Sequence, residues 1–416
     1  MTQSRKRRIL YINHTGNVSG AEKVLVNILR SLDRVKYEPF VSCPAEGDLQ
    51  RLVEQESIQC LTIPSIHARF TLRPGRLLRY VSSLCRALGA IRKLIREVDP
   101  DIVHANTLRA GIAATLATIG VNRTVIWHVH DILPRHPIST VIRFLAYVSE
   151  RTRIVAVSNA AARAFSGAFS FKNRVRTIYN GTDLGRFPLK RRGVSPFRRE
   201  AGIPDEAFLV CSVGQICARK GLLELLDAFS RIHTRSPQMH FALVGSVVFQ
   251  HEEKYREELE LAADASGIAA RVHFTGERRD VSAVLQAADL LVLNSSEEPF
   301  GLVLIEAMSS GTPVLATRVG GIPEIVRDSE NGWLVERGDT AHLASKLLEL
   351  SRNNDMLAQA ARVGHEVTCQ KFTLERFQSN LHRCYADIDV KNTSPMNAAG
   401  QASLAEYSNK EGVSDA

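Results

Sequence analysis

The sequence alternates twice between segments typical of buried strands and segments typical of helices. In the first half, RRILYIN, DIVHA and RIVAV are strand-like and AEKVLVNILRSL is helix-like. A stretch rich in Gly, Pro and Arg follows Tyr179, and AFLVCSVG, MHFALVG and ADLLVLNS then begin a second series. Because strands that alternate with helices pair in parallel through right-handed crossovers, we expect an α/β protein with two doubly wound parallel sheets.

The same pattern divides the chain into five parts. We expect a Rossmann-like domain over residues 1–185, a linker over 186–206 and a second Rossmann-like domain over 207–371. A C-terminal helix over 372–389 could cross back to the first domain. Residues 390–416 are small, polar and without apolar periodicity, which predicts a disordered tail.

The positive charge of the chain is confined to its first half. Residues 1–190 contain 29 Lys and Arg against 13 Asp and Glu, a net charge of +16, whereas the remainder contains 24 against 31, a net charge of −7. Such a basic half suits a polyanion or an anionic membrane surface. No apolar stretch reaches the roughly 18 to 20 residues of a spanning helix, so we expect a cytoplasmic protein.

Residues 73–98 combine an apolar stripe with many basic side chains. Apolar residues recur along one helix face from Leu77 through Val81 to Val98, and the other positions hold seven Arg and Lys with no acidic residue before Glu97. We favour a crossover helix whose stripe packs on its own sheet. The alternative is that its basic face also rests on anionic lipid headgroups.

The seven cysteines are scattered along the chain, odd in number and never spaced as C-x-x-C. We therefore expect neither a disulfide framework nor a zinc site. Most of the cysteines are interpreted as small buried apolar side chains.

Residues 296–317 (SEEPFGLVLIEAMSSGTPVLAT) hold the strongest candidate binding residues. A strand-like segment precedes them and SGTP ends the helix, which predicts a strand, a loop, a short helix and a second strand. Glu298 then lies on the loop, and Phe300 and Gly301 lie at a helix N-terminus, where free amides attract anions. A Glu in such a place is commonly only a cap or a solvated side chain. The apolar residues around Glu306 instead predict burial, and a buried carboxylate needs donors such as sugar hydroxyls.

Two further loops follow strand-like segments. Gly16 and Gly20 flank a loop that allows close backbone approach to a ligand, although a plain turn is an equal alternative. Its spacing matches neither a dinucleotide-binding nor a P-loop motif. Arg219 and Lys220 follow the first strand of the second series, where cations can offset the charge of a diphosphate, although two adjacent basic residues are often merely solvated.

The ordered series of motifs resembles the retaining glycosyltransferases of family 4, which have the GT-B fold of two facing Rossmann-like domains. The series spans nearly the whole chain and consists of GAEKVL, DIVHANT, HVHD, IVAVSNAA, VRTIYNGTDLGRF, VGQICARKG, FALVG, VHFTG, the pair Glu298 and Glu306, EAMSSGTPVLATRVGGIPEIV and NGWLV. The resemblance implies transfer of a hexose from a nucleotide-diphosphate sugar to an acceptor hydroxyl with retention of configuration. It also implies that no metal ion and no cofactor take part.

The resemblance assigns roles to individual residues. Glu306 corresponds to the glutamate that holds the ribose hydroxyls of the nucleotide, and Glu298 to the glutamate near the transferred sugar and the diphosphate. Lys220, with Arg219 beside it, corresponds to the lysine that binds the diphosphate. His130 corresponds to the first-domain histidine near the reacting centre.

The remaining implied roles concern the donor. Phe300 and Gly301 would offer backbone amides to sugar or phosphate, and Gly16 lies in the loop that closes over the donor. One residue departs from the family pattern, because Gln215 stands where the family usually has an arginine. The resemblance favours same-face attack, in which the donor phosphate takes the acceptor proton. We therefore take His130, Glu298 and Lys220 as candidate catalytic residues without making Glu298 a nucleophile.

The strand that ends in HVHD allows the histidines to be distinguished. His128 and His130 are two residues apart and share a face, and His130 lies nearer the carboxyl end, where ligands of such sheets bind. We interpret His130 as functional and His128 as structural. His104 in DIVHANT is also interpreted as structural, with an acceptor-side role as the alternative.

These observations predict an enzyme of lipid-linked or cell-surface polysaccharide or glycolipid assembly, peripheral at the inner face of a membrane. The expected partners are a nucleotide-sugar donor, a carbohydrate or lipid-linked acceptor and an anionic membrane surface. Nucleic acid is not expected, because Tyr80 is the single aromatic residue in the basic helix. The alternatives are a non-catalytic polyanion-binding protein and a nucleotide-sugar epimerase. Acceptor specificity is expected in loops 66–75 and 133–139.

Overall fold

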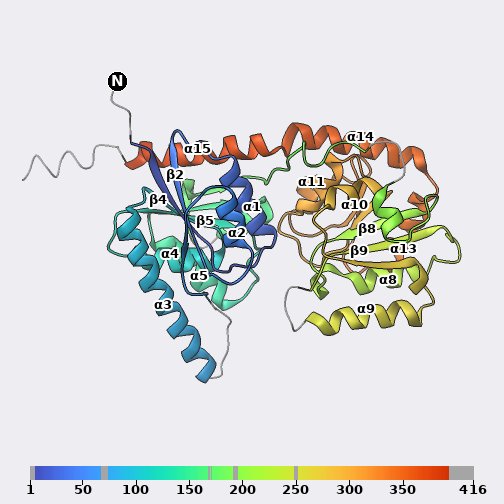
Figure 1. The fold of residues 1–416 in the computed structure, drawn as a ribbon, viewed down its shortest axis with the longest axis horizontal. Coiled ribbons are helices and arrows are strands. Elements are labelled where there is room, and N and C mark those ends of the chain that lie inside the picture. The colour runs from blue at the N-terminus through green and yellow to red at the C-terminus, as the bar shows by residue number, and fades with distance from the viewer. Residues whose placement is uncertain are drawn as a thin grey trace, which may run out of the picture. The chain divides into compact units, whose positions relative to one another are not determined.

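The computed structural model describes residues 5–66, 74–166, 169, 171–190, 195–247 and 252–392, and shows two parallel sheets (Figure 1). The first sheet has seven strands in the order β3-β2-β1-β4-β5-β6-β7. Its elements are β1 (Arg7–Ile12), α1 (Gly20–Arg30), β2 (Tyr37–Cys43), α2 (Leu49–Gln55), β3 (Cys60–Thr62), α3 (Pro74–Val98), β4 (Ile102–Ala105), α4 (Leu108–Ala117), β5 (Thr124–Val129), α5 (Pro137–Val148), β6 (Thr152–Ala156), α6 (Asn159–Ala162) and β7 (Val175–Thr177).

The second sheet has six strands in the order β10-β9-β8-β11-β12-β13. Its elements, with the helices that follow it, are α7 (Pro196–Glu200), β8 (Phe208–Val213), α8 (Leu222–Ser230), β9 (Met239–Val244), α9 (Glu253–Ala265), β10 (Val272–Gly276), α10 (Val281–Ala287), β11 (Leu290–Leu293), α11 (Leu302–Ser309), β12 (Val314–Thr317), α12 (Ile322–Ile325), β13 (Trp333–Val335), α13 (Thr340–Leu350), α14 (Asn354–Lys371) and α15 (Leu374–Asn392).

Both sheets confirm the predicted doubly wound arrangement. The strand order reverses between β1 and β4 in the first sheet and between β8 and β11 in the second. Ligands of open parallel sheets bind beyond the carboxyl ends of the strands at such a reversal. The loops after these four strands are therefore the places in which to look for a site.

Packing between α4 and β5 holds the first sheet in place. Trp127 of β5 is fully buried, and its indole Nε1 donates to Thr115 Oγ1 of α4 at 2.9 Å. A Cβ on Gly111 would lie 2.6 Å from the Trp127 ring, so only glycine lets the helix approach this closely. Because side chains alternate along a strand, the histidines on either side of Trp127 point to the other face of the sheet.

The basic helix is α3, and its described part packs as we favoured. Ile91, Ile95 and Val98 are buried, and Ile91 and Ile95 join the core of the first sheet. The expectation for Val81 is wrong, because this side chain is 51% exposed. Ser83 is buried in its place and donates to the carbonyl oxygen of Ser65 at 2.8 Å. Arg73 and the side chains of residues 76–79 lie outside the described residues.

The described part of the segment between the sheets contains one short helix. Its Arg198, in α7, is buried and donates to the carbonyl oxygens of Ala207 at 2.7 Å and Ala287 at 2.9 Å. The same guanidinium pairs with Asp289 at 2.7 Å. The second half of the predicted linker therefore packs against α10 and beside the starts of β8 and β11. The boundaries drawn from the sequence, and the return of the C-terminal helix to the first domain, stay predictions.

Several other predictions can be compared with the structure. All seven cysteines are free in the structure, and Cys43, Cys211, Cys217 and Cys384 are buried. No helix within the described ranges is both long and apolar enough to cross a bilayer. Residues 191–194 of the linker, residues 67–73 of the first predicted acceptor loop and residues 393–416 of the predicted tail lie outside the described residues.

Candidate active site

Lys220 and Glu298 meet at the reversal point of the second sheet. Lys220 ends a short 3₁₀ helix (Ala218–Lys220) after β8, and Glu298 lies on the loop after β11. The Lys220 Nζ atom lies 2.7 Å from Glu298 Oε2. Their side chains are only 15% and 11% exposed, respectively. Two candidates that are distant in the sequence thus form one ion pair that water reaches poorly.

Contacts between the two loops explain why Lys220 takes this position. Gly221 has a φ of +61°, and a Cβ there would lie 2.2 Å from the carbonyl oxygen of Asn294. The Asn294 side chain donates to the carbonyl oxygen of Gly221 at 2.8 Å. The backbone amide of Ser296 donates to the carbonyl oxygen of Arg219 at 2.8 Å. Glycine is therefore needed both for the backbone angle and for the close approach.

Glu298 is held by a second pair of glycines, which follow β12. The amide of Gly321 donates to the carbonyl oxygen of Glu298 at 2.9 Å, and a Cβ on Gly320 would lie 2.0 Å from that same oxygen. The Ser295 hydroxyl donates to Glu298 Oε2 at 3.3 Å. The only local signal of this role for Gly320 and Gly321 is that a Gly-Gly pair follows a strand.

The segment 296–317 has the predicted order of strand, loop, helix and strand. Gly301 precedes α11 with a φ of +100°, and Phe300 is buried, with its ring centroid 6.1 Å from that of Phe372. Glu306 lies on α11 and is partly buried, and no described residue donates a hydrogen bond to its carboxylate. Burial raises the pKa of the Glu306 carboxyl, and the charges of Lys23 and Arg186 partly offset this effect. A partly buried carboxylate without a donor remains available to a ligand that brings hydroxyl groups.

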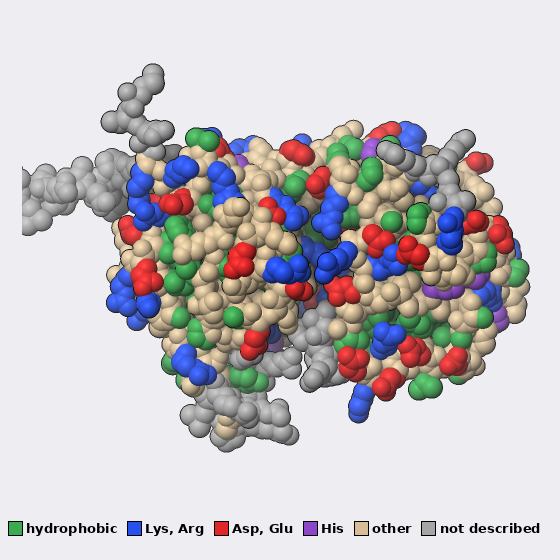
Figure 2. All heavy atoms as spheres, in the orientation of Figure 1, with side chains coloured by type: hydrophobic (Ala, Val, Ile, Leu, Met, Phe, Trp, Pro, Cys, Tyr) green, Lys and Arg blue, Asp and Glu red, His purple; other side chains and the backbone are tan. Residues whose placement is uncertain are grey.

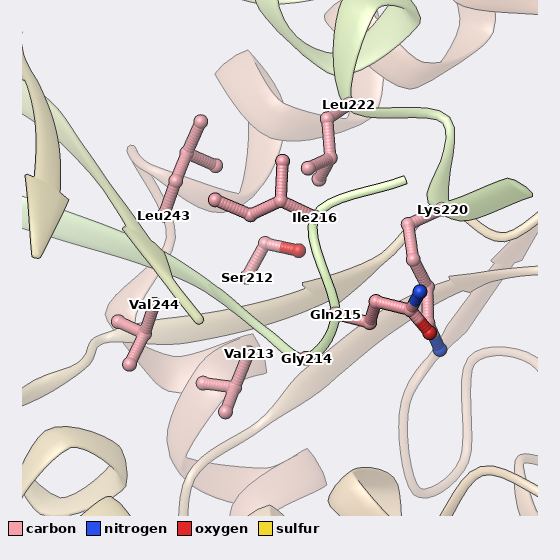
Figure 3. Close-up of a pocket in the computed structure, with 9 residues that line it drawn as sticks. All are labelled: Ser212, Val213, Gly214, Gln215, Ile216, Lys220, Leu222, Leu243 and Val244. Atoms are coloured by element: carbon pink, nitrogen blue, oxygen red, sulfur yellow. The ribbon is translucent and has the colours of Figure 1, made fainter. Parts of the chain in front are cut away.

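A small open cavity lies beside Lys220, at the carboxyl ends of β8 and β9 (Figure 3). Gln215 lines it, and its Nε2 donates to Glu252 Oε2 at 2.7 Å. The Gln215 side chain, which stands where the family usually has an arginine, is thus already hydrogen-bonded to the Glu252 carboxylate. Arg219 is exposed and donates to the carbonyl oxygen of Glu297 at 3.2 Å, so it does not join the Lys220–Glu298 pair. The lining residues are Ser212, Val213, Gly214, Gln215, Ile216, Lys220, Leu222, Leu243 and Val244.

Gly16 lies in the loop after β1, where the chain itself makes the close approach. A Cβ on Gly16 would lie 1.7 Å from the carbonyl oxygen of Glu46, and the amide of Leu49 donates to the Gly16 carbonyl at 2.9 Å. The need for glycine at this position therefore comes from the segment after β2, which lies directly against Gly16. Contact of Gly16 with a donor stays a prediction.

A buried polar network at the reversal point of the first sheet was not anticipated from the sequence. The Glu22 carboxylate accepts from the Ser19 amide at 2.9 Å and from Asn13 Nδ2 at 3.0 Å. Asn106 Nδ2 in turn donates to Asn13 Oδ1 at 3.1 Å. The available signal was Ser-x-x-Glu at the start of α1, a capping box that holds the preceding loop.

Three histidines line one face of the first sheet near its carboxyl edge. The ring centroids of His104 and His128 are 5.4 Å apart, and those of His128 and His130 are 4.2 Å apart, which confirms that the last two share a face. Burial lowers the pKa of His104 and of His130 to about 3, and that of His128 well below its ordinary value. All three are therefore neutral at pH 7. His128 and His104 are fully buried, whereas His130 is partly accessible.

Two family models match successive parts of the chain. The model described as Glycosyltransferase Family 4 covers residues 18–186, and the model described as Glycosyl transferases group 1 covers residues 194–366. The first match contains helix α1 and the three histidines of the first sheet. The second match contains Lys220, Glu298 and Glu306.

Individual proteins give the same result. The lipopolysaccharide core biosynthesis glycosyltransferase LpsE of Rhizobium meliloti (strain 1021) is 32% identical over 205 residues, which are 49% of this chain and only 56% of LpsE. The D-inositol 3-phosphate glycosyltransferase of Salinispora tropica is 28% identical over 410 residues, with 90% of this chain and 82% of that protein covered. The crystal structure of Anabaena Alr3699/HepE in complex with UDP-glucose superposes with a TM-score of 0.79 at 27% identity, over 91% of this chain and 99% of that one.

Proposed function

We propose that this chain, which belongs to the family 4 glycosyltransferases and has their GT-B fold, moves a sugar from a nucleotide-diphosphate sugar to an acceptor hydroxyl with retention of configuration. The observation that carries the proposal is the Lys220–Glu298 pair beside the cavity at the reversal point of the second sheet. A cation with a nearby acceptor of hydrogen bonds suits a sugar diphosphate, which has both negative charge and hydroxyl groups.

Lys220 is proposed to act on the leaving group. The diphosphate gains negative charge as the bond to the sugar breaks, so an ammonium group next to it stabilises the transition state more than the bound donor. Lys220 Nζ is held by Glu298 at 2.7 Å, and an ammonium has three protons to donate. It can therefore contact a phosphate oxygen without leaving its carboxylate partner. Glu298 orients Lys220, and its Oε1 oxygen is available to a sugar hydroxyl.

Glu306 is proposed to bind the ribose of the donor. Its carboxylate has no donor among the described residues, and the two ribose hydroxyls would supply them. Phe300, Gly301 and Gly16 remain proposed donor contacts, with Arg219 as an outer cation. Because Gln215 is already bonded to Glu252, we propose that the diphosphate relies on Lys220 rather than on the position where the family has an arginine.

His130 is proposed to lie near the reacting sugar as a neutral group. Since its pKa is about 3, its imidazole carries no charge at pH 7 and can accept or donate one hydrogen bond to a hydroxyl. We further propose same-face attack, in which the acceptor oxygen attacks the anomeric carbon, the bond to the donor phosphate breaks and a phosphate oxygen takes the acceptor proton. In this proposal neither a divalent metal nor another cofactor takes part, because Lys220 supplies the positive charge.

The biological setting is proposed from chemistry and from similar proteins. LpsE is named for lipopolysaccharide core biosynthesis, and HepE has been crystallised with UDP-glucose. We therefore propose a UDP-sugar as the first donor to test, and an acceptor that is lipid-linked or belongs to cell-surface polysaccharide or glycolipid assembly. The net charge of +16 over residues 1–190 supports a cytoplasmic protein that is peripheral at the inner face of a membrane.

Nucleotide binding and release test the proposal. UDP and GDP are expected to raise the melting temperature of the wild type, and UDP- or GDP-sugars with membrane extract are expected to release nucleoside diphosphate in the presence of EDTA. Lys220→Gln should lose most of the nucleotide-induced shift. Lys36→Gln is the matched control, because Lys36 is 73% exposed and far from the site in sequence. No shift and no release with any donor would overturn the proposed function.

A further inference from the structure

Helix α5 packs Ile142 and Leu145 on the core but exposes five other apolar side chains. Val141 is 64% exposed, Phe144 52%, Val148 51%, Ile138 39% and Tyr147 38%. Residues three and four apart are neighbours on a helix surface, so these side chains adjoin one another as one patch. The buried residues of this helix are only Ser139 and Ala146. We call the five exposed residues the α5 patch.

The concentration of these side chains is unusual for a soluble surface. Among the described residues, eleven large apolar side chains are exposed, and five of them belong to α5. Scattered exposed apolar residues are ordinary, whereas a contiguous patch marks an interaction surface. Val35 and Leu261, which are 82% and 68% exposed, are examples of the scattered kind.

Arginines lie along the α5 helix and at both of its ends, together with one exposed acidic residue, Glu150, after the helix. The helix contains Arg143 and no acidic residue, and exposed Arg135 and Arg151 lie before and after it. The Arg174 guanidinium donates to the carbonyl oxygens of Tyr147 and Ser149 at 3.0 and 2.9 Å and lies 5.5 Å from the centre of the Tyr147 ring. Arginine thus borders the apolar side chains along the helix and at its end.

The charge of the surrounding domain has the same sign. Figure 2 shows Lys and Arg side chains interspersed with Asp and Glu on the face of the first domain that is turned to the viewer, and the excess of Lys and Arg over residues 1–190 makes the net charge positive. Helix α4 packs against both α3 and α5, and α3 exposes Arg86, Arg92, Lys93 and Arg96. Apolar side chains bordered by arginine fit the interface of an anionic bilayer, where rings and aliphatic groups enter the acyl boundary and cations meet phosphate groups.

We propose that the α5 patch is the surface by which the protein docks on an anionic lipid bilayer. The α3 helix adds long-range attraction through its basic residues, and α5 adds apolar insertion. Helix α5 starts at Pro137, seven residues after His130, so docking would bring the lipid surface near the carboxyl edge of the first sheet. The inference deepens the proposed function by naming the surface that presents a lipid-linked acceptor, but the exposed patch itself does not depend on sugar transfer.

Vesicle co-sedimentation of the full chain tests this inference. The wild type is expected to bind phosphatidylcholine vesicles only when phosphatidylglycerol is included, and to bind less as salt increases. V141S/F144S should reduce binding roughly tenfold or more, because two exposed apolar side chains no longer enter the bilayer. R151Q should weaken binding to the anionic vesicles by a smaller factor. V35S/L261S is the matched control and should bind like the wild type.

Three outcomes would overturn the inference. They are a wild type that does not sediment with anionic vesicles, a V141S/F144S variant that binds as well as the wild type, and a dimer that V141S/F144S dissociates without any effect on vesicle binding. The last outcome would assign the patch to a second copy of the chain. The UDP-induced shift in melting temperature is measured on the same samples and should be equal in all of them. Its absence throughout would refute the proposed function while the vesicle result still decides the role of the α5 patch.

Discussion

The Lys220 ammonium and the Glu298 carboxylate, 78 residues apart in the sequence, approach to 2.7 Å at the carboxyl edge of the second sheet. Each is the principal charged partner of the other, and both are mostly shielded from water. In such surroundings, the loss of the Glu298 charge and the loss of the Lys220 charge should have different effects on nucleotide binding and on turnover.

Glu298→Gln should separate nucleotide binding from turnover. The glutamine keeps a hydrogen-bond acceptor for Lys220 but removes the charge that competes with the diphosphate, so UDP should bind at least as tightly as in the wild type. Turnover should fall on the order of a hundredfold, because a neutral amide holds Lys220 less firmly than a carboxylate and the sugar loses a charged acceptor. Isothermal titration with UDP and a nucleotide-release assay measure the two effects.

The neighbouring Glu297 provides the control for this variant. Glu297 is exposed and its side chain has no hydrogen-bond or ion-pair partner within the described parts of the chain, so Glu297→Gln should leave both measurements unchanged. Equal losses of turnover in the two variants, or a large loss of UDP affinity in Glu298→Gln alone, would contradict the proposed role of the pair.

Glu306→Gln should raise the melting temperature of the protein and weaken its binding of UDP. Burial raises the pKa of this carboxyl, so the folded state disfavours its charge and the free energy of unfolding decreases as the pH rises through the raised pKa. Removing the charge should therefore raise the melting temperature at pH 7.5. UDP affinity should fall roughly tenfold or more, because ribose hydroxyls lose a charged acceptor. A lower melting temperature together with unchanged UDP affinity would assign Glu306 a structural role.

The sequence was sufficient for the elements and for the main candidates because both depend on local patterns. Alternation of strands and helices predicts two parallel sheets, and Gly-Thr-Pro after an apolar helix predicts the end of α11. The reversal points then follow from topology, and Lys220, Glu298 and His130 all lie just beyond the ends of strands.

What the sequence did not reveal depends on contacts between distant residues. No local pattern shows that Gly221 must admit the carbonyl of Asn294, or that Gly320 must admit that of Glu298. No local pattern shows that Gly16 must also admit the carbonyl of Glu46, and contact of Gly16 with a donor stays a prediction. Helix α5 has an amphipathic pattern, and an apolar face is expected to point inward. Only the structure shows that Val141 and Phe144 point outward.

The histidine face predicts a loss of stability in mild acid. His104 and His130 have pKa values of about 3 when folded, whereas unfolded histidines titrate near 6.5, so the unfolded chain binds more protons between these values. The free energy of unfolding should therefore decrease as pH falls below about 6.5, by up to about 1.4 kcal/mol per histidine per pH unit. Chemical denaturation at several pH values measures the slope. His128→Phe removes one of the three groups and should make the slope smaller, and an unchanged slope would refute the assignment.

Two glycines with nearly the same backbone angle separate conformational strain from steric clash. Gly221 has a φ of +61° and Gly202 a φ of +66°, but a Cβ on Gly221 meets the carbonyl oxygen of Asn294, whereas a Cβ on Gly202 meets open space. Gly202→Ala should therefore lower the free energy of unfolding by only about 1 to 2 kcal/mol, the cost of a left-handed angle in alanine. Gly221→Ala should cost clearly more, and it should also weaken UDP binding, because the loop that carries Lys220 must move away from the loop that carries Glu298. Urea denaturation and UDP titration of both variants provide the comparison. Equal destabilisation with intact UDP binding would show that the close approach of the two loops does not hold Lys220 in its position.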